Sequence, residues 1–141
     1  MNEFYRLSPE VAGGLGPRTT MQRDTWPPTV SYLHYVVEGW DGDDLLESFP
    51  CFLISSKMGD KLSQLSLTGF ELRDVEVTKS REFEYAFPTI SLPDFRWLTV
   101  ANSPGAADFG LEVNATLIVS ARALQCLQTG SLRHCDIESY P

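Results

Sequence analysis

The chain has 141 residues, of which 43% are hydrophobic and 21% charged, which predicts one globular domain over residues 1–141 and excludes a disordered chain. Its formal net charge is −8, with only 11 lysines and arginines, so direct nucleic-acid binding through phosphate contacts is disfavoured and a partner with a basic face is favoured. No apolar run is long enough for a membrane span and the N-terminus lacks a secretion-signal pattern, so we expect a cytoplasmic protein without membrane association.

The first part of the chain predicts short strands separated by loops. Residues 4–7 form a candidate first strand, and residues 30–37 are rich in β-branched and aromatic side chains, which is typical of a strand. The glycine-rich residues 13–17 lie between them and do not match a phosphate-binding loop. Residues 50–54 predict the next strand.

The second part predicts an alternation of strands and helices. A helix begins at Ser55 and places Met58, Leu62 and Leu65 on one apolar face. A second helix is expected over residues 121–128. The remaining extended segments are strands over residues 70–78, 95–100, 115–120 and 132–140, and an extended connection over residues 80–87.

Two segments resemble each other, residues 52–77 and residues 117–138. Each runs from an apolar strand through a serine and an amphipathic helix to a glycine, then to a strand with an Asp-aliphatic-Glu sequence. In this alignment Ser55 corresponds to Ser120, Gly69 to Gly130, and Asp74-Val75-Glu76 to Asp136-Ile137-Glu138. Such units also arise by chance, but the matching order favours a structural repeat. We therefore predict an α+β domain, a mainly antiparallel sheet with short helices on one face and two repeated strand–helix–strand units.

The acidic segment at residues 38–52, EGWDGDDLLESFPCF, carries five carboxylates in its first ten residues. A calcium loop is excluded because Leu46 occupies the position that requires glycine. Residues 40–48 are expected to form a turn that runs into a short acidic helix, and its carboxylates face either solvent or a basic partner. The predicted partner-binding residues are Trp40, Asp41, Asp43, Asp44 and Glu47, with the tryptophan as an anchor or as a core residue.

Catalytic and metal motifs are absent from the sequence. Zinc-ligand spacing is missing, no serine lies in a nucleophile-elbow motif, and we expect no cofactor. The three cysteines form neither an even set nor a Cys-x-x-Cys motif, so free thiols are expected. A cysteine and a histidine that meet only in the folded chain stay open as an alternative, as does a pair of carboxylates.

Short motifs at both ends resemble a known family. Phe4-Tyr5-Arg6-Leu7 near the start, and Ile118-Val119-Ser120 followed by Leu124 and Leu127, are similar to immunity proteins of bacterial polymorphic toxin systems, in a myxobacterial-type family first defined by a domain of unknown function. The resemblance implies a cytoplasmic protein that binds and blocks a toxin and catalyses nothing. We therefore predict stoichiometric neutralisation of a cognate toxin domain, such as a basic nuclease. The alternatives are a small enzyme and a general protein-interaction module.

Overall fold

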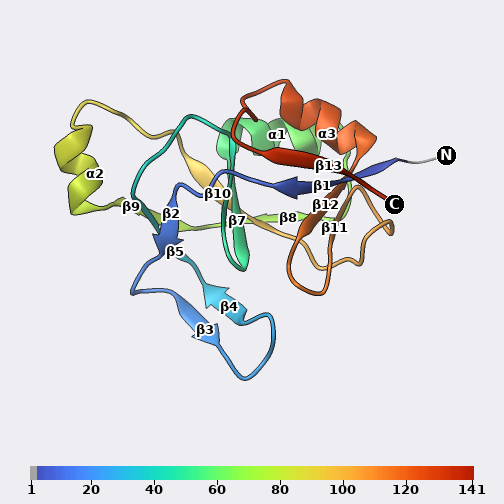
Figure 1. Ribbon diagram of the computed structural model, residues 1–141, viewed down its shortest axis with the longest axis horizontal. Helices are drawn as coiled ribbons and strands as arrows, with labels where there is room; N and C mark the ends of the chain where they lie inside the picture. Colours follow the sequence, from blue (N-terminus) through green and yellow to red (C-terminus); the bar gives the residue numbers. More distant parts are fainter. Residues whose placement is uncertain (1–2) are drawn as a thin grey trace.

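Two four-stranded sheets form most of the protein (Figure 1). The computed structural model describes residues 3–141, which form a single α+β domain of mainly antiparallel sheets with three short helices, as the sequence predicts. The elements of these two sheets and their helices are β1 (Phe4–Ser8), β6 (Leu45–Ser48), β7 (Cys51–Ser55), α1 (Ser56–Gln64), β8 (Glu71–Arg73), β10 (Phe95–Thr99), β11 (Phe109–Leu111), β12 (Leu117–Ser120), α3 (Ala121–Gln128) and β13 (Asp136–Tyr140). The strand orders are β6-β7-β10-β8 and β11-β12-β1-β13.

The two sheets share their strand register as well as their order. All neighbours within them are antiparallel. Equivalent residue pairs lie at equivalent positions, Phe95–Ser55 and Thr99–Glu71 in the first sheet, Phe4–Ser120 and Ser8–Asp136 in the second. The repeat predicted from residues 52–77 and 117–138 therefore extends to whole sheets.

One inner strand of each sheet comes from the other half of the chain. β10 precedes β11, β12 and β13 in sequence but lies between β7 and β8, and β1 precedes β6 but lies between β12 and β13. The two exchanged strands have similar sequences, FYRLS and FRWLT. Two equivalent backbone hydrogen bonds lie just outside these strands: Ala121 N donates to Glu3 O at 3.0 Å, and Ser56 N donates to Asp94 O at 2.8 Å. The fold is thus two similar halves that exchange their first strands.

Helices α1 and α3 contact each other and lie on the same side of the sheets (Figure 1). Each begins at a serine cap: Ser55 Oγ accepts from Met58 N at 3.3 Å, and Ser120 Oγ accepts from Ala123 N at 3.1 Å. Their buried faces, which include Leu62 from α1, join one hydrophobic core with strands of both sheets. Among the described residues, no helix is long and apolar enough to cross a bilayer.

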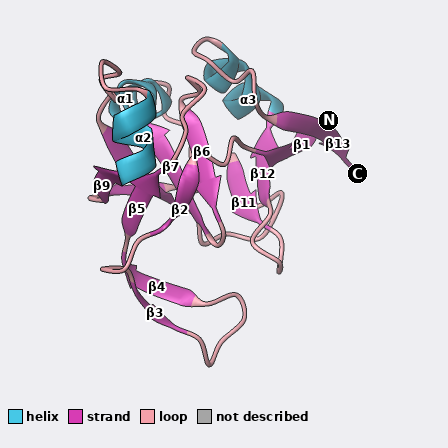
Figure 2. Ribbon diagram, turned by 60° about the vertical axis from the view of Figure 1, so that its left-hand side comes forward, coloured by secondary structure: helices cyan, strands magenta, loops and turns pink. Residues whose placement is uncertain are grey.

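A smaller sheet packs beside these two and carries a projecting hairpin (Figure 2). It consists of β2 (Gly13–Leu15), β5 (His34–Val37) and β9 (Glu76–Lys79); the hairpin pairs β3 (Thr20–Gln22) with β4 (Thr29–Tyr32), and helix α2 (Arg81–Ala86) follows β9. β5 and β9 are parallel, so both end at the same edge of the sheet, where α2 begins. Tyr35 and Phe83 are fully buried in a second core between this sheet and the β6-β7-β10-β8 sheet.

Four local predictions are wrong. Residues 70–78 are not one strand, because they divide into β8 of the β6-β7-β10-β8 sheet and β9 of the smaller sheet. Residues 45–48 form strand β6 and not an acidic helix, because their backbone pairs with β7 and the two preceding aspartates accept from distant segments. Residues 80–87 contain helix α2 and are not extended, because Ser80 Oγ caps Phe83 N at 3.0 Å. The equivalent of Asp136–Glu138 is Glu71–Arg73 and not Asp74–Glu76, as the shared register shows.

Candidate functional site

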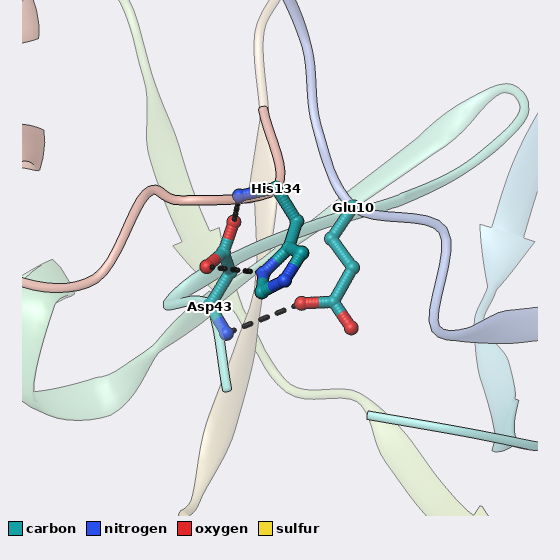
Figure 3. A group of neighbouring side chains, drawn as sticks. All are labelled: Glu10, Asp43 and His134. Carbon is teal, nitrogen blue, oxygen red and sulfur yellow. Dashed lines mark hydrogen bonds and ion pairs between the residues drawn. The ribbon is translucent and has the colours of Figure 1, made fainter. Parts of the chain in front are cut away.

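Asp43, at the centre of the acidic segment, is completely buried. Its carboxylate accepts from Arg133 N at 3.0 Å, His134 N at 2.7 Å and Ser131 Oγ at 3.1 Å, and the His134 Nδ1 atom lies 3.2 Å away (Figure 3). Two backbone N–H groups and one hydroxyl therefore satisfy the hydrogen-bonding capacity of this buried carboxylate. Asp43 fixes the turn before β13 and is not available for a surface contact, so its predicted role in partner binding is corrected.

Glu10 supports the same segment from the other side. It is 5% exposed, and its carboxylate accepts from Asp41 N at 2.6 Å and from Asp43 N at 3.1 Å. Burial raises the pKa of Glu10, and these two backbone bonds oppose that shift. Three segments far apart in the sequence, at residues 10, 43 and 134, are thus held together by two carboxylates (Figure 3).

The side chains of Glu10, Asp43 and His134 form the group of potential metal ligands within residues 3–141, with ligand atoms within 4.8 Å of one another. A cation there would compete with the N–H donors that already occupy both carboxylates. Displacing those donors would leave backbone N–H groups without partners in a largely buried place, which costs about 1–3 kcal/mol each. The donor set fits a structural cross-link better than a metal centre.

Asp44 has a matched counterpart in the other half of the chain. Asp44 accepts from Ser55 Oγ at 2.7 Å and from Ser131 N at 2.7 Å. Asp108 accepts from Ser120 Oγ at 2.7 Å and from Thr68 N at 2.9 Å. Each aspartate thus joins the helix cap of its own half to the loop after the helix of the other half.

The electrostatics of Asp108 agree with this role. Burial acts to raise its pKa, but the hydrogen bonds from Ser120 and Thr68 and the nearby Arg122 charge outweigh it, so the pKa lies below its ordinary value. The ionised form is therefore the one that the fold stabilises. Asp44 makes the equivalent bonds and is half-buried, so it joins two loops, and its place on a partner-binding surface stays a prediction.

The other predicted residues divide between interior and surface. Trp40 is half-buried: its Nε1 donates to Asp43 O at 3.0 Å and its ring meets Phe95 edge-on, with centroids 6.2 Å apart. Glu47 is half-buried and burial raises its pKa. Asp41 is the one exposed carboxylate of the predicted set.

An exposed acidic and aromatic region lies where β5 and β9 end. Ser80 N donates to Val37 O at 2.8 Å, which places the start of α2 beside the acidic segment. We define the α2 surface as the exposed residues Glu38, Asp41, Glu82, Glu84 and Tyr85; Arg81, also exposed at the start of α2, is the basic residue beside them. The side chain of Tyr85 is 90% exposed, an unusual position for a large aromatic group. This surface was not predicted, because residues 80–87 were expected to be an extended connection. The signal for it in the sequence is Ser80 followed by two glutamates, a helix-start pattern.

The cysteines and histidines do not form a reactive pair. Burial raises the pKa of Cys51 and of Cys135 to about 12, and also raises that of Cys126, so all three thiols stay protonated near neutral pH. His34 is buried, with Nε2 2.8 Å from Thr78 Oγ1 and Nδ1 accepting from Arg18 N at 3.3 Å. Within residues 3–141 neither histidine side chain bonds to a thiol.

Comparison with known proteins gives no family assignment: no protein-family model matches the chain, and no curated protein matches it.

Proposed function

We propose that this protein is an immunity protein that binds a cognate toxin domain stoichiometrically and blocks it without catalysis. The observation that carries the proposal is the α2 surface, which has four exposed carboxylates and an exposed tyrosine. The resemblance of both chain ends to immunity proteins of polymorphic toxin systems supports the same function.

The α2 surface has the properties of a recognition site for a basic protein. Carboxylates on a protein of net charge −8 attract a positively charged partner over long range and raise the association rate. Tyr85 offers a large rigid side chain of the type that becomes an energetic anchor once it is desolvated. A nuclease carries basic side chains in its substrate cleft, so occlusion of that cleft by the α2 surface would block it.

The arrangement of the ionisable groups supports binding over catalysis. Asp43, Asp44 and Asp108 hold loops, and the buried thiols have raised pKa values, so these groups do not supply a general base or an activated nucleophile. The carboxylates that remain on the α2 surface are open to solvent, where charge attraction is their main physical effect.

The test is co-expression with the product of the gene immediately upstream, which the proposal expects to be a toxin. We expect a one-to-one complex and survival of the cell. Glu82→Lys/Glu84→Lys is expected to weaken the complex by roughly tenfold or more at low salt, because it reverses two charges that face the partner. Asp60→Lys/Asp136→Lys is the matched control, since it makes the same change in net charge outside the α2 surface.

The outcomes discriminate the candidates. Failure to bind or to protect would refute the immunity function and leave a general interaction module. Equal weakening by both double variants would show that net charge acts without the α2 surface. Binding that does not respond to salt would contradict a role for the carboxylates.

A further inference from the structure

Strand β9 has an open edge. It pairs with β5 on one side, through Glu76 N to Leu33 O at 3.0 Å and Ser80 N to Val37 O at 2.8 Å. In a parallel pair, alternate residues direct both backbone groups to the same neighbour. Val77 and Lys79 therefore direct their N–H and C=O groups away from β5, and within residues 3–141 no strand pairs with them on that side.

A groove runs along this edge. Its volume is about 470 Å³, and one wall is formed by Val75, Val77 and Lys79. The opposite wall is the segment from Ser91 to Phe95, which leads into β10. The residues of β9 that line the groove include the two whose backbone groups are unpaired, so the groove offers donors and acceptors in the pattern of a missing strand.

The charges of the surrounding segment are mostly negative. Residues 74–95, which form both walls and the helix between them, contain five acidic and two basic residues. The charge of Glu76 is paired with Arg18, whereas Lys79 Nζ donates to the neutral Ile90 O at 2.8 Å and keeps its positive charge. The exposed charges of the segment are then Asp74, Glu82, Glu84 and Asp94 against Arg81.

We propose that this groove accepts an extended, basic segment of the partner protein, which adds to β9 as a strand. Hydrogen bonds to Val77 and Lys79 would supply affinity without regard to side chains, and the exposed carboxylates would select lysine and arginine. This inference rests on the proposed function and names how the partner is held: the strand lies in the groove while the adjoining part of the partner contacts the α2 surface.

The test uses the intact, isotope-labelled protein and a blocked peptide of sequence Lys-Val-Thr-Val-Lys-Val-Thr-Val. Amide resonances are followed by NMR at neutral pH and low salt. We expect the Val77 and Lys79 amides to shift and to become protected from hydrogen exchange, whereas the Thr78 amide, which faces β5, is protected with and without peptide. A peptide with glutamate in place of lysine is expected to bind roughly tenfold more weakly.

Ser91→Trp provides the matched variant, because Ser91 is exposed and lies on the wall opposite β9. The indole would occupy the groove and reduce peptide binding about tenfold, while Ser63→Trp on the exposed face of α1 leaves it unchanged. Shifts centred on β13, an edge strand outside this groove, or the absence of binding, would overturn the proposal. If the Val77 and Lys79 amides do not respond but co-expression still protects the cell, strand addition in the groove is refuted and the immunity function stands. If the amides respond but co-expression does not protect the cell, the immunity function alone is refuted.

Discussion

Replacement of Asp43 by alanine tests whether the acidic segment is structural. The side chain is 0% exposed, and its oxygens accept from two backbone N–H groups, at Arg133 and His134, and from the Ser131 hydroxyl. In Asp43→Ala these three donors lose a charged acceptor. The turn before β13 would then no longer be fixed to the start of β6.

The expected loss of stability follows from those donors. A hydrogen bond to a charged group contributes about 1.5–3 kcal/mol, and a neutral one about 0.5–1.5 kcal/mol. Since the side chains of Arg133 and His134 are exposed, water reaches part of this turn after the substitution and lowers the cost. We therefore expect a decrease of about 3 kcal/mol in the free energy of unfolding, below the roughly 4.5–9 kcal/mol that three such charged bonds would sum to without this access of water. Asp41→Ala is the control, because Asp41 is exposed and lies two residues earlier. This substitution is expected to change the free energy of unfolding by less than about 0.5 kcal/mol.

The measurement is urea unfolding followed by circular dichroism and tryptophan fluorescence, with hydrogen exchange of the Arg133 and His134 amides as a local reading. Wild-type exchange at these two amides is expected to be slow, and the alanine variant fast. A variant as stable as the Asp41→Ala control would refute the assignment of Asp43 as a buried cross-link. It would return this carboxylate to the list of candidate binding residues.

Three further predictions follow from the same contacts. Asp44→Ala and Asp108→Ala are expected to lower the free energy of unfolding by similar amounts, about 2–3 kcal/mol each, because each removes one serine and one backbone partner, and Asp108 loses in addition only the exposed bond from Thr68 Oγ1. A large loss at one site only would argue that the two halves are not energetically equivalent. The hydrogen bond from Arg18 holds the pKa of Glu76 at about 2, below its ordinary value of 4.5. The contribution of Glu76 to the free energy of unfolding is therefore complete above pH 4.5 and is lost as the pH falls toward 2. Glu76→Gln should flatten the dependence of this free energy on pH between these values, and an unchanged slope would contradict the pairing. Iodoacetamide at neutral pH is expected to label Cys51 and Cys135 only after unfolding, because burial raises the pKa of each thiol to about 12; rapid labelling of the native protein would favour the enzyme alternative.

The sequence predicted elements whose local signals agree with their tertiary contacts. Helix α3 has an apolar face and a serine cap, and both are used in the fold. The strand at residues 95–99 is as apolar as its inner position between β7 and β8 requires. The helix predicted at residues 45–48 was wrong because the strand conformation of these residues comes from pairing with β7. The two preceding aspartates resemble a helix cap in the local sequence, but they bind distant segments.

The alignment of the repeat failed for a different reason. Asp74-Val75-Glu76 matches Asp136-Ile137-Glu138 letter by letter, but Glu71 is the residue opposite Thr99, as Asp136 is opposite Ser8. The equivalence is defined by the exchanged strands β1 and β10, which lie outside both aligned segments. A comparison limited to residues 52–77 and 117–138 therefore lacks the strands that set the register.

The exposed carboxylates differ from those predicted, because the sequence shows how many carboxylates a segment has but not which of them point to solvent. Backbone N–H groups from other parts of the chain donate hydrogen bonds to Asp43 and Asp44. These carboxylates therefore have partners other than lysine or arginine, and nothing in the local sequence indicates those partners. Glu38 directly follows Val37, whose carbonyl accepts from Ser80 N, so the parallel pairing of β5 and β9 brings the start of the acidic segment to the start of α2. The negative surface proposed for a basic partner is built from two segments about forty residues apart, and Tyr85 is its most exposed aromatic residue.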